Sequence, residues 1–341
     1  MKSISIPIIS FFLFCVTLVH AQIPADYYDG TEGLTGEELK SALHNIIKDH
    51  VEYSYSDLRD FILPDSDEDP DNSNNVILIY TGISRAKSNF GGGQGQWNRE
   101  HVWAKSHGDF GTSPPAGSDA HHVRPADVQV NSTRSNLDFD NGGSPVSGCQ
   151  GCKIDDDSFE PPDDVKGDVA RMIFYMAVRY EGDDGEPDLE VVDRVNTSPA
   201  PEHGKLSTLL VWNNQDPPDD FEMNRNEVVY GYQQNRNPFI DHPEFVDEIW
   251  GNANAIADNL NMNLSCYPNP FVNRVFIEYG GSSTLTWFVE SMDGKTVEKG
   301  VMHPGKSAIN LADDNPGLYV LVIRDANGRQ VKTYKLLKTV R

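Results

Sequence analysis

The chain has 341 residues, with 52 acidic and 28 basic side chains and a formal net charge of −24 at pH 7. That length suits one large domain or two ordinary ones, and the composition is globular. The acidic excess repels polyanions at long range and argues against nucleic-acid binding through a broad basic face. A few arginines and a bound divalent cation can still reverse the potential locally.

Residues 1–21 have the pattern of a secretory signal peptide. Lys2 precedes an apolar run from Ile4 to Val19, and Ala21 supplies a small residue at the expected cleavage point. A membrane anchor is the alternative, but the run is short and no stop-transfer cluster follows it. We therefore expect an exported protein without stable membrane insertion.

Hydrophobic periodicity predicts four helices in the exported chain. The first covers residues 39–47, after a capping-box pattern at Thr35 and Glu38, and the others cover 163–180, 221–234 and 243–257. On the second helix Arg171 lies off the apolar stripe.

Between the first two helices, the acidic run 65–75 resembles a calcium loop but lacks its glycine and closing glutamate. We expect a solvated loop there, followed by a short strand over residues 76–80.

Two of the cysteines are close in sequence. Cys149 and Cys152 could form a tight disulfide, a redox pair or half of a metal site, and in an exported chain with no second pair the disulfide is favoured. Cys266 is left over, and we expect it to be unpaired.

The composition changes near residues 262–266. From Cys266 onward the runs VFIEY, LTWFVE and LYVLVIRD alternate with turn signals at 293–294 and 327–328. This pattern predicts a small all-β domain over residues 263–341, after a larger domain over residues 22–262.

Two polar clusters hold the candidates for chemistry, WNREHVWAKSH at 97–107 and DAHHVRPADVQVNSTRSN at 119–136. Histidine is the commonest general base near neutral pH, and carboxylate and amide oxygens suit hard divalent cations. Because neighbours on a strand point to opposite faces, adjacent Glu100 and His101 can do separate tasks.

From the residues alone, several alternatives stay open for these clusters. They could be loop residues bonded to each other, a zinc site built on His101, His107, His121 and His122 with Asp119, or part of a sugar hydrolase with two carboxylates. A serine hydrolase is disfavoured because the chain has no Gly-x-Ser-x-Gly elbow.

Four ordered stretches resemble the successive motifs of the bacterial endonuclease I family of secreted nucleases. They are NREHVWAKSHG, SDAHHVRPADVQVNSTRSNLDF, EPPDDVKGDVARMIFYMAVRY and WNNQDPPDDFEMNRNEVVYGYQQNRNPFIDHPEF, which together span about residues 75–250. The resemblance implies an α+β fold with a ββα-metal, or His-Me finger, core. In that core a two-stranded ribbon and a helix hold a histidine and one divalent ion against the scissile phosphate.

Residue by residue, the resemblance implies that His101 is the general base and that Glu100 and Asn131 bind the metal, Mg²⁺ or another divalent cation such as Mn²⁺ or Ca²⁺. It makes Asp119 and His121 supports that orient the ribbon and the metal ligands. Arg134 is the first candidate for a phosphate contact, since a guanidinium can grip two phosphate oxygens. Arg171 and Arg236 match later motifs and are expected to line the same groove.

The C-terminal domain has its own resemblance. YPNPF, MDGKTV, NPGLYVLVIRD and a basic end resemble the C-terminal sorting domain of the type IX secretion system. A β-sandwich that binds a carbohydrate or a surface is the alternative.

Together these patterns predict a secreted, monomeric, metal-dependent and sequence-nonspecific endonuclease. We expect it to cleave DNA, and RNA as well, and to meet the type IX secretion machinery during export. A ribonuclease preference and a noncatalytic exported binding protein are the alternatives.

Overall fold

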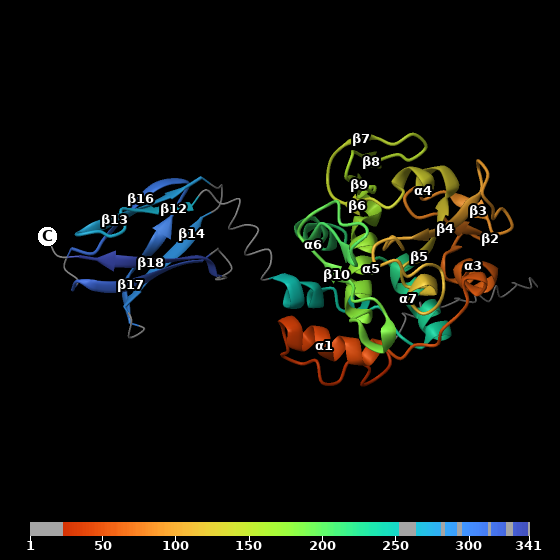
Figure 1. Cartoon of the computed structure of the whole chain (residues 1–341), viewed down its shortest axis with the longest axis horizontal. Coiled ribbons are helices and arrows are strands. Elements are labelled where there is room, and N and C mark those ends of the chain that lie inside the picture. Colours follow the sequence, from red (N-terminus) through yellow and green to blue (C-terminus); the bar gives the residue numbers. More distant parts are fainter. Residues whose placement is uncertain are drawn as a thin grey trace, which may run out of the picture.

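The computed structural model describes residues 23–251 and 264–339, except residues 281–283, 292–294, 313–314 and 325–329. The predicted signal peptide and the boundary predicted at residues 262 and 263 lie outside the described residues. Within them, no helix is long and apolar enough to cross a membrane. An N-terminal unit of helices and small sheets is followed by an all-β unit (Figure 1), which confirms the predicted fold class.

The N-terminal unit contains eight labelled helices and eleven short strands among its described residues. The helices are α1 (Gly36–Ile47), α2 (Tyr55–Asp57), α3 (Leu63–Ser66), α4 (Val128–Arg134), α5 (Lys166–Arg179), α6 (Leu206–Gln215), α7 (Asp220–Gln233) and α8 (Pro238–Asp241), and residues 244–251 are also helical. A π-helical turn, Leu58–Ile62, joins α2 to α3. The strands are β1 (Glu68–Asp69), β2 (Asn72–Ile77), β3 (Ser84–Ala86), β4 (Trp97–His101), β5 (Val123–Asp127), β6 (Asp138–Phe139), β7 (Ser144–Pro145), β8 (Lys153–Ile154), β9 (Ser158–Glu160), β10 (Glu190–Val191) and β11 (Glu202–His203).

Helix α5 runs through the middle of the N-terminal unit (Figure 1). All of its residues are buried, including those off the apolar stripe. The predicted helix at 163–180 is confirmed, but it is enclosed on every side and not exposed along one face. Its polar side chains therefore need buried partners, because an unpaired charge in the interior is costly.

Two local predictions near the N-terminus are wrong. Thr35 precedes α1, but its side chain makes no capping hydrogen bond. The acidic run 65–75 is not a solvated loop: it ends α3 and forms the β1–β2 hairpin. Its Asp67 is fully buried between Arg124 and Arg225, at 2.5 and 3.2 Å, and these ion pairs hold the run against the core.

A two-stranded ribbon followed by a short helix carries four of the candidate residues, Glu100, His101, Asn131 and Arg134. Strands β4 and β5 pair antiparallel, with Glu100 opposite Arg124 and His101 opposite Val123. Helix α4 follows at once because the side chain of Asp127 accepts hydrogen bonds from the amides of Gln129 and Val130, at 2.9 and 3.3 Å.

Cys149 and Cys152 are joined by a disulfide, and both are buried against the core that contains α5. Cys266 is free and partly buried. The disulfide closes the turn between β7 and β8, outside the ribbon.

The C-terminal unit consists of two antiparallel sheets. One has the order β12 (Leu264–Tyr267), β13 (Arg274–Tyr279) and β16 (Gly305–Asn310). The other has the order β15 (Thr296–Met302), β14 (Leu285–Ser291), β17 (Gly317–Arg324) and β18 (Gln330–Lys338). Alternate residues such as Val275 and Ile277, or Leu285 and Val289, enter one shared core, as the period-2 pattern predicts.

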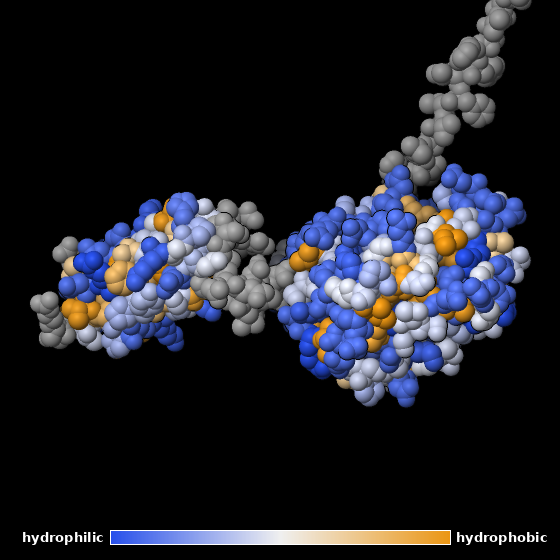
Figure 2. Space-filling model, turned by 90° about the horizontal axis from the view of Figure 1, so that it is seen from above, coloured by the Kyte–Doolittle hydropathy of each residue, from blue (hydrophilic) through white to orange (hydrophobic). Residues whose placement is uncertain are grey.

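The exposed surface is mostly hydrophilic in the view of Figure 2, and apolar side chains gather only in small patches. This agrees with the large acidic excess of the sequence.

Candidate functional site

A cavity of about 630 Å³ opens over the ribbon. Strand β4, the loop after it, helix α4 and Tyr55 from α2 contribute its lining, and Glu100, His101, Asn131 and Arg134 are all part of it. The two polar clusters of the sequence therefore meet in one place. A second cavity, of about 580 Å³, lies between residues 48–52, 108–116 and 179–187 and contains none of these four residues.

His101 is held in the form that a general base requires. Its Nε2 lies 3.0 Å from the carbonyl oxygen of Gly117 and must donate to it, because a carbonyl only accepts. The neutral ring then carries its lone pair on Nδ1, which has no hydrogen-bonding partner among the described residues. Burial lowers the pKa of His101 to about 3, so the ring is neutral at neutral pH.

Glu100 extends from the same strand and is almost fully buried. Tyr80 donates a hydrogen bond of 2.8 Å to its Oε1, and Arg134 Nη1 lies 3.4 Å from the same oxygen. The described residues offer no partner for Oε2. Burial raises the pKa of Glu100, which means that its charged form lacks sufficient compensation from the protein alone.

Asn131 presents its amide oxygen to the cavity. Its Nδ2 donates to Asn98 Oδ1 at 2.9 Å and approaches the carbonyl oxygen of Arg99 at 3.4 Å. These contacts fix which way the amide points and leave Oδ1 without a partner among the described residues. A buried carboxylate oxygen and an oriented amide oxygen fit a hard divalent cation.

Arg134 is not exposed to a phosphate, which corrects the sequence expectation. Its side chain is fully buried, and its guanidinium donates to the carbonyls of His101 and Val102, at 3.2 and 2.7 Å. It therefore joins the backbone of His101 to Glu100. The motif that contains Arg134 could not show this, because the direction of its side chain depends on how α4 packs against β4.

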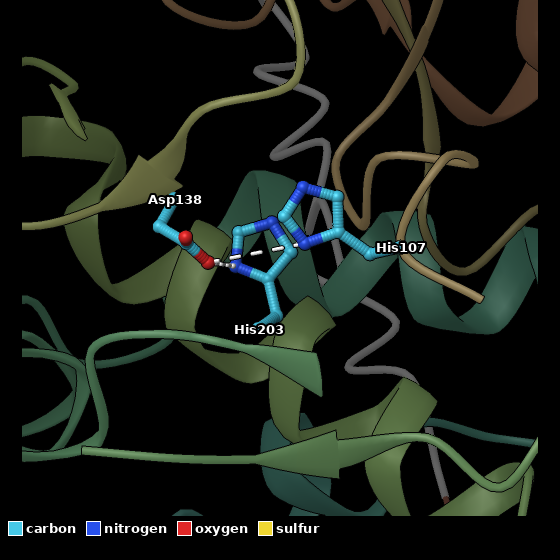
Figure 3. Close-up of side chains that lie close together, drawn as sticks. All are labelled: His107, Asp138 and His203. Atoms are coloured by element: carbon cyan, nitrogen blue, oxygen red, sulfur yellow. Dashed lines mark ion pairs between the residues drawn. The ribbon is translucent and has the colours of Figure 1, made fainter. Parts of the chain in front are cut away.

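Behind Arg134 lies a buried cluster of His107, Asp138 and His203 (Figure 3). His203 Nε2 lies 3.3 Å from Arg134 Nη2, and its Nδ1 lies 3.3 Å from Asp138 Oδ1. Burial and the charge of Arg134 keep the pKa of His203 well below its ordinary value, so Nε2 accepts and Nδ1 donates. The cluster thus fixes Arg134 from its far side.

The same three side chains fit a metal ion poorly. The rings of His107 and His203 stack at 22° with centroids 4.7 Å apart, so their in-plane lone pairs do not converge on one point. Both nitrogens of His107 also have protein partners: Nε2 lies 2.7 Å from the carbonyl oxygen of Asn136, and Nδ1 lies 2.9 Å from the hydroxyl of Thr197 and 2.8 Å from the carbonyl oxygen of Glu202.

Asp119 and His121 lie in the core beneath the ribbon. Asp119 accepts hydrogen bonds from Tyr175, Tyr180 and Gln233, at 2.8, 2.9 and 3.0 Å. His121 Nε2 donates to the carbonyl of Asn235 at 3.1 Å. These bonds tie the segment that enters β5 to α5 and α7, and no hydrogen bond joins either residue to Glu100 or Asn131 within the described residues.

Arg171 and Arg236 do not line the cavity, which corrects the expectation that they line the same groove as Arg134. Both are buried: Arg171 pairs with Glu222 at 2.5 Å, and Arg236 pairs with Asp241 at 2.6 Å. In an acid-rich chain these guanidinium groups neutralise interior carboxylates.

Sequence reasoning missed two tyrosines of the site. Tyr80 hydrogen-bonds Glu100, and the ring of Tyr55 stacks on His101 with centroids 5.4 Å apart. Both precede the first polar cluster in the sequence, and neither stands in a motif.

The site combines a neutral histidine that has a free ring nitrogen with carboxylate and amide oxygens that have no partner among the described residues. This combination is typical of a hydrolase that activates water. A family model described as Endonuclease I matches residues 35–244, and one described as secretion system C-terminal sorting domain matches residues 265–338. The chain belongs to the Endonuclease I family.

Two curated relatives agree with this assignment. The extracellular ribonuclease of Bacillus subtilis (strain 168) is 64% identical over 225 residues, which cover 66% of this chain and 78% of that protein. The extracellular ribonuclease of Bacillus amyloliquefaciens is 62% identical over 225 residues, with the same coverage. The protein is a secreted endonuclease that hydrolyses phosphodiester bonds and carries a type IX sorting domain.

Proposed function

We propose that the protein is a divalent-metal-dependent, sequence-nonspecific endonuclease that cleaves DNA and RNA. The observation that carries the proposal is the shared cavity, in which His101 Nδ1, a Glu100 oxygen and Asn131 Oδ1 have no partner within the part of the chain that the structure describes. Glu100 and Asn131 would hold the ion, Mg²⁺ or another divalent cation. When bound, it would neutralise charge that develops on the phosphate and the leaving oxygen.

His101 accepts the proton of the attacking water at Nδ1. Its Nε2–H bond to Gly117 keeps the ring oriented and strengthens as the ring becomes charged. The water oxygen bonds to phosphorus and the P–O3′ bond breaks, which leaves a 5′-phosphate on one product. The leaving O3′ takes a proton from solvent and becomes the 3′-hydroxyl of the other product. Arg134 and Tyr80 keep Glu100 in place while this occurs.

RNA is supported as a substrate by the two relatives, which are both named extracellular ribonucleases. A ribonuclease preference is therefore the second candidate function. We also propose that Asp119 and His121 support the ribbon and that the nuclease acts as a monomer, which would elute at about 38.0 kDa as the full chain.

Incubation of the mature chain with plasmid DNA and with RNA, in Mg²⁺ and in EDTA, tests the proposal. We expect both polymers to be degraded in Mg²⁺ and neither in EDTA. Degradation that persists in EDTA would refute the metal mechanism. Intact substrates in Mg²⁺, Mn²⁺ and Ca²⁺ would favour the noncatalytic binding protein.

A further inference from the structure

Nearly every cation of the N-terminal unit is already neutralised by a carboxylate. Residues 23–251 contain ten arginines and seven lysines, and all but two of them lie within 3.9 Å of an aspartate or glutamate oxygen. The two without such a partner among the described residues are Arg99 and Lys105.

Both unpaired cations line the cavity that contains His101. Arg99 is half-buried on β4, and Lys105 is exposed in the loop after it. Asp109 also lines the cavity but forms an ion pair with neither. In a chain with nearly twice as many acidic as basic groups, two cations left unpaired at one site indicate that their counter-charge comes from outside.

Tyr55 fixes the position of the Arg99 guanidinium at the cavity. Its Cζ lies 3.4 Å from the centroid of the Tyr55 ring, and its Nη1 donates to the Tyr55 carbonyl. The remaining N–H groups have no acceptor among the described residues. Arg99 and His101 are two residues apart on β4, so they lie on the same face of the strand. Both contact the ring of Tyr55.

We propose that Arg99 and Lys105 are the phosphate contacts of this nuclease and bind the backbone of the nucleic-acid strand beside the scissile bond. The inference deepens the proposed function, because it takes its substrate class from it. It assigns the phosphate contacts, which the sequence had placed on the buried Arg134, Arg171 and Arg236, to two accessible cations. Contacts to phosphate carry no sequence information, which agrees with cleavage that ignores sequence.

Salt dependence of binding tests the two contacts. Fluorescence anisotropy in EDTA measures the affinity of the full mature chain for a labelled single-stranded RNA and for the same sequence as DNA, across a series of NaCl concentrations. Arg99→Met, Lys105→Met and the double variant are compared with wild type. Lys153→Met is the matched control, because Lys153 is half-exposed, pairs with Glu160 and lies outside the cavity.

Each lost phosphate contact reduces the slope of log K against log salt by about 0.7 for a single strand. We therefore expect each single variant to bind about five-fold more weakly at ~0.1 M salt, with the two effects adding in the double variant. Arg99→Lys, which keeps the charge, should retain the slope, and Lys153→Met should match wild type. Thermal melts of all variants report whether each one is folded.

Slopes equal to wild type in Arg99→Met and Lys105→Met would overturn the inference, as would a wild type that binds neither strand at low salt. Because binding is measured in EDTA, it does not depend on cleavage. A wild type that binds with the expected slopes but cleaves nothing in Mg²⁺ would refute the proposed function and leave the phosphate contacts standing.

Discussion

Tyr80→Phe removes a single hydroxyl that the structure places against the proposed metal ligand. The hydroxyl donates a hydrogen bond of 2.8 Å to Glu100 Oε1, and both residues are almost fully buried. Among the described residues, the only other cation or donor at that oxygen is Arg134 Nη1, at 3.4 Å. Phenylalanine keeps the ring and its packing, so the substitution isolates the hydrogen bond.

The expected effect is a 10- to 100-fold loss of divalent-ion affinity. Removing an outer hydrogen bond to a metal ligand has about this cost, and a hydrogen bond to a charged group contributes about 1.5–3 kcal/mol, which is a similar range. Burial already raises the pKa of Glu100, and loss of the Tyr80 donor raises it further. Protons then compete better for the carboxylate, so the loss of affinity should be larger at acidic than at basic pH.

Calorimetric titration of Mn²⁺ or Mg²⁺ into each variant measures this affinity. Tyr28→Phe is the matched control: its hydroxyl donates a 2.6 Å bond to Asp241, and Tyr28 lies outside the cavity. The control should lose comparable stability and keep the ion affinity of wild type. If Tyr80→Phe also keeps wild-type ion affinity, Tyr80 does not position the metal ligand and the reasoning fails.

Two further predictions follow from burial and charge, and a third from the sorting domain. Arg171→Met should lower the free energy of unfolding by about 3–5 kcal/mol, because Glu222 loses its buried partner, while KM of the folded enzyme stays unchanged. Urea titration measures the free energy of unfolding and steady-state kinetics measures KM. A raised KM would indicate that Arg171 contacts the substrate after all. Burial lowers the pKa of His121 and of His122 to about 4, so between pH 4 and pH 6.5 the unfolded chain binds more protons than the folded chain and acid favours unfolding. From pH 7 to pH 5 each histidine should cost about 2 kcal/mol of stability, which urea unfolding at the two values tests, and equal stability would contradict it. Deletion of residues 264–341 should abolish export beyond the periplasm yet leave the activity of the purified nuclease unit intact; normal export would contradict the sorting assignment.

The elements that were predictable are those with strong local periodicity. The helices α1 and α5 and the strands β13, β14 and β17 each repeat apolar residues at the spacing of their own geometry. The family resemblance of their two motifs is what joins Glu100, His101 and Asn131 in one predicted site, and the structure places these three residues around one cavity.

The residues that were not predictable depend on contacts between distant parts of the chain. Whether an arginine faces a groove or a buried carboxylate is decided by partners such as Glu222, which lies 51 residues after Arg171. Tyr80 reaches Glu100 from 20 residues upstream, in an apolar stretch with no motif. Arg99 lies inside the first polar cluster, but only the ion pairs of the other cations reveal that it has no carboxylate partner among the described residues.

The central claim is that His101 moves the proton while Glu100 and Asn131 hold the ion. Turnover and ion binding of His101→Ala, measured on one preparation, test it most directly. The account predicts at least ~100-fold slower cleavage, as expected for loss of a general base, with ion affinity unchanged from wild type. Cleavage at the wild-type rate would contradict the account.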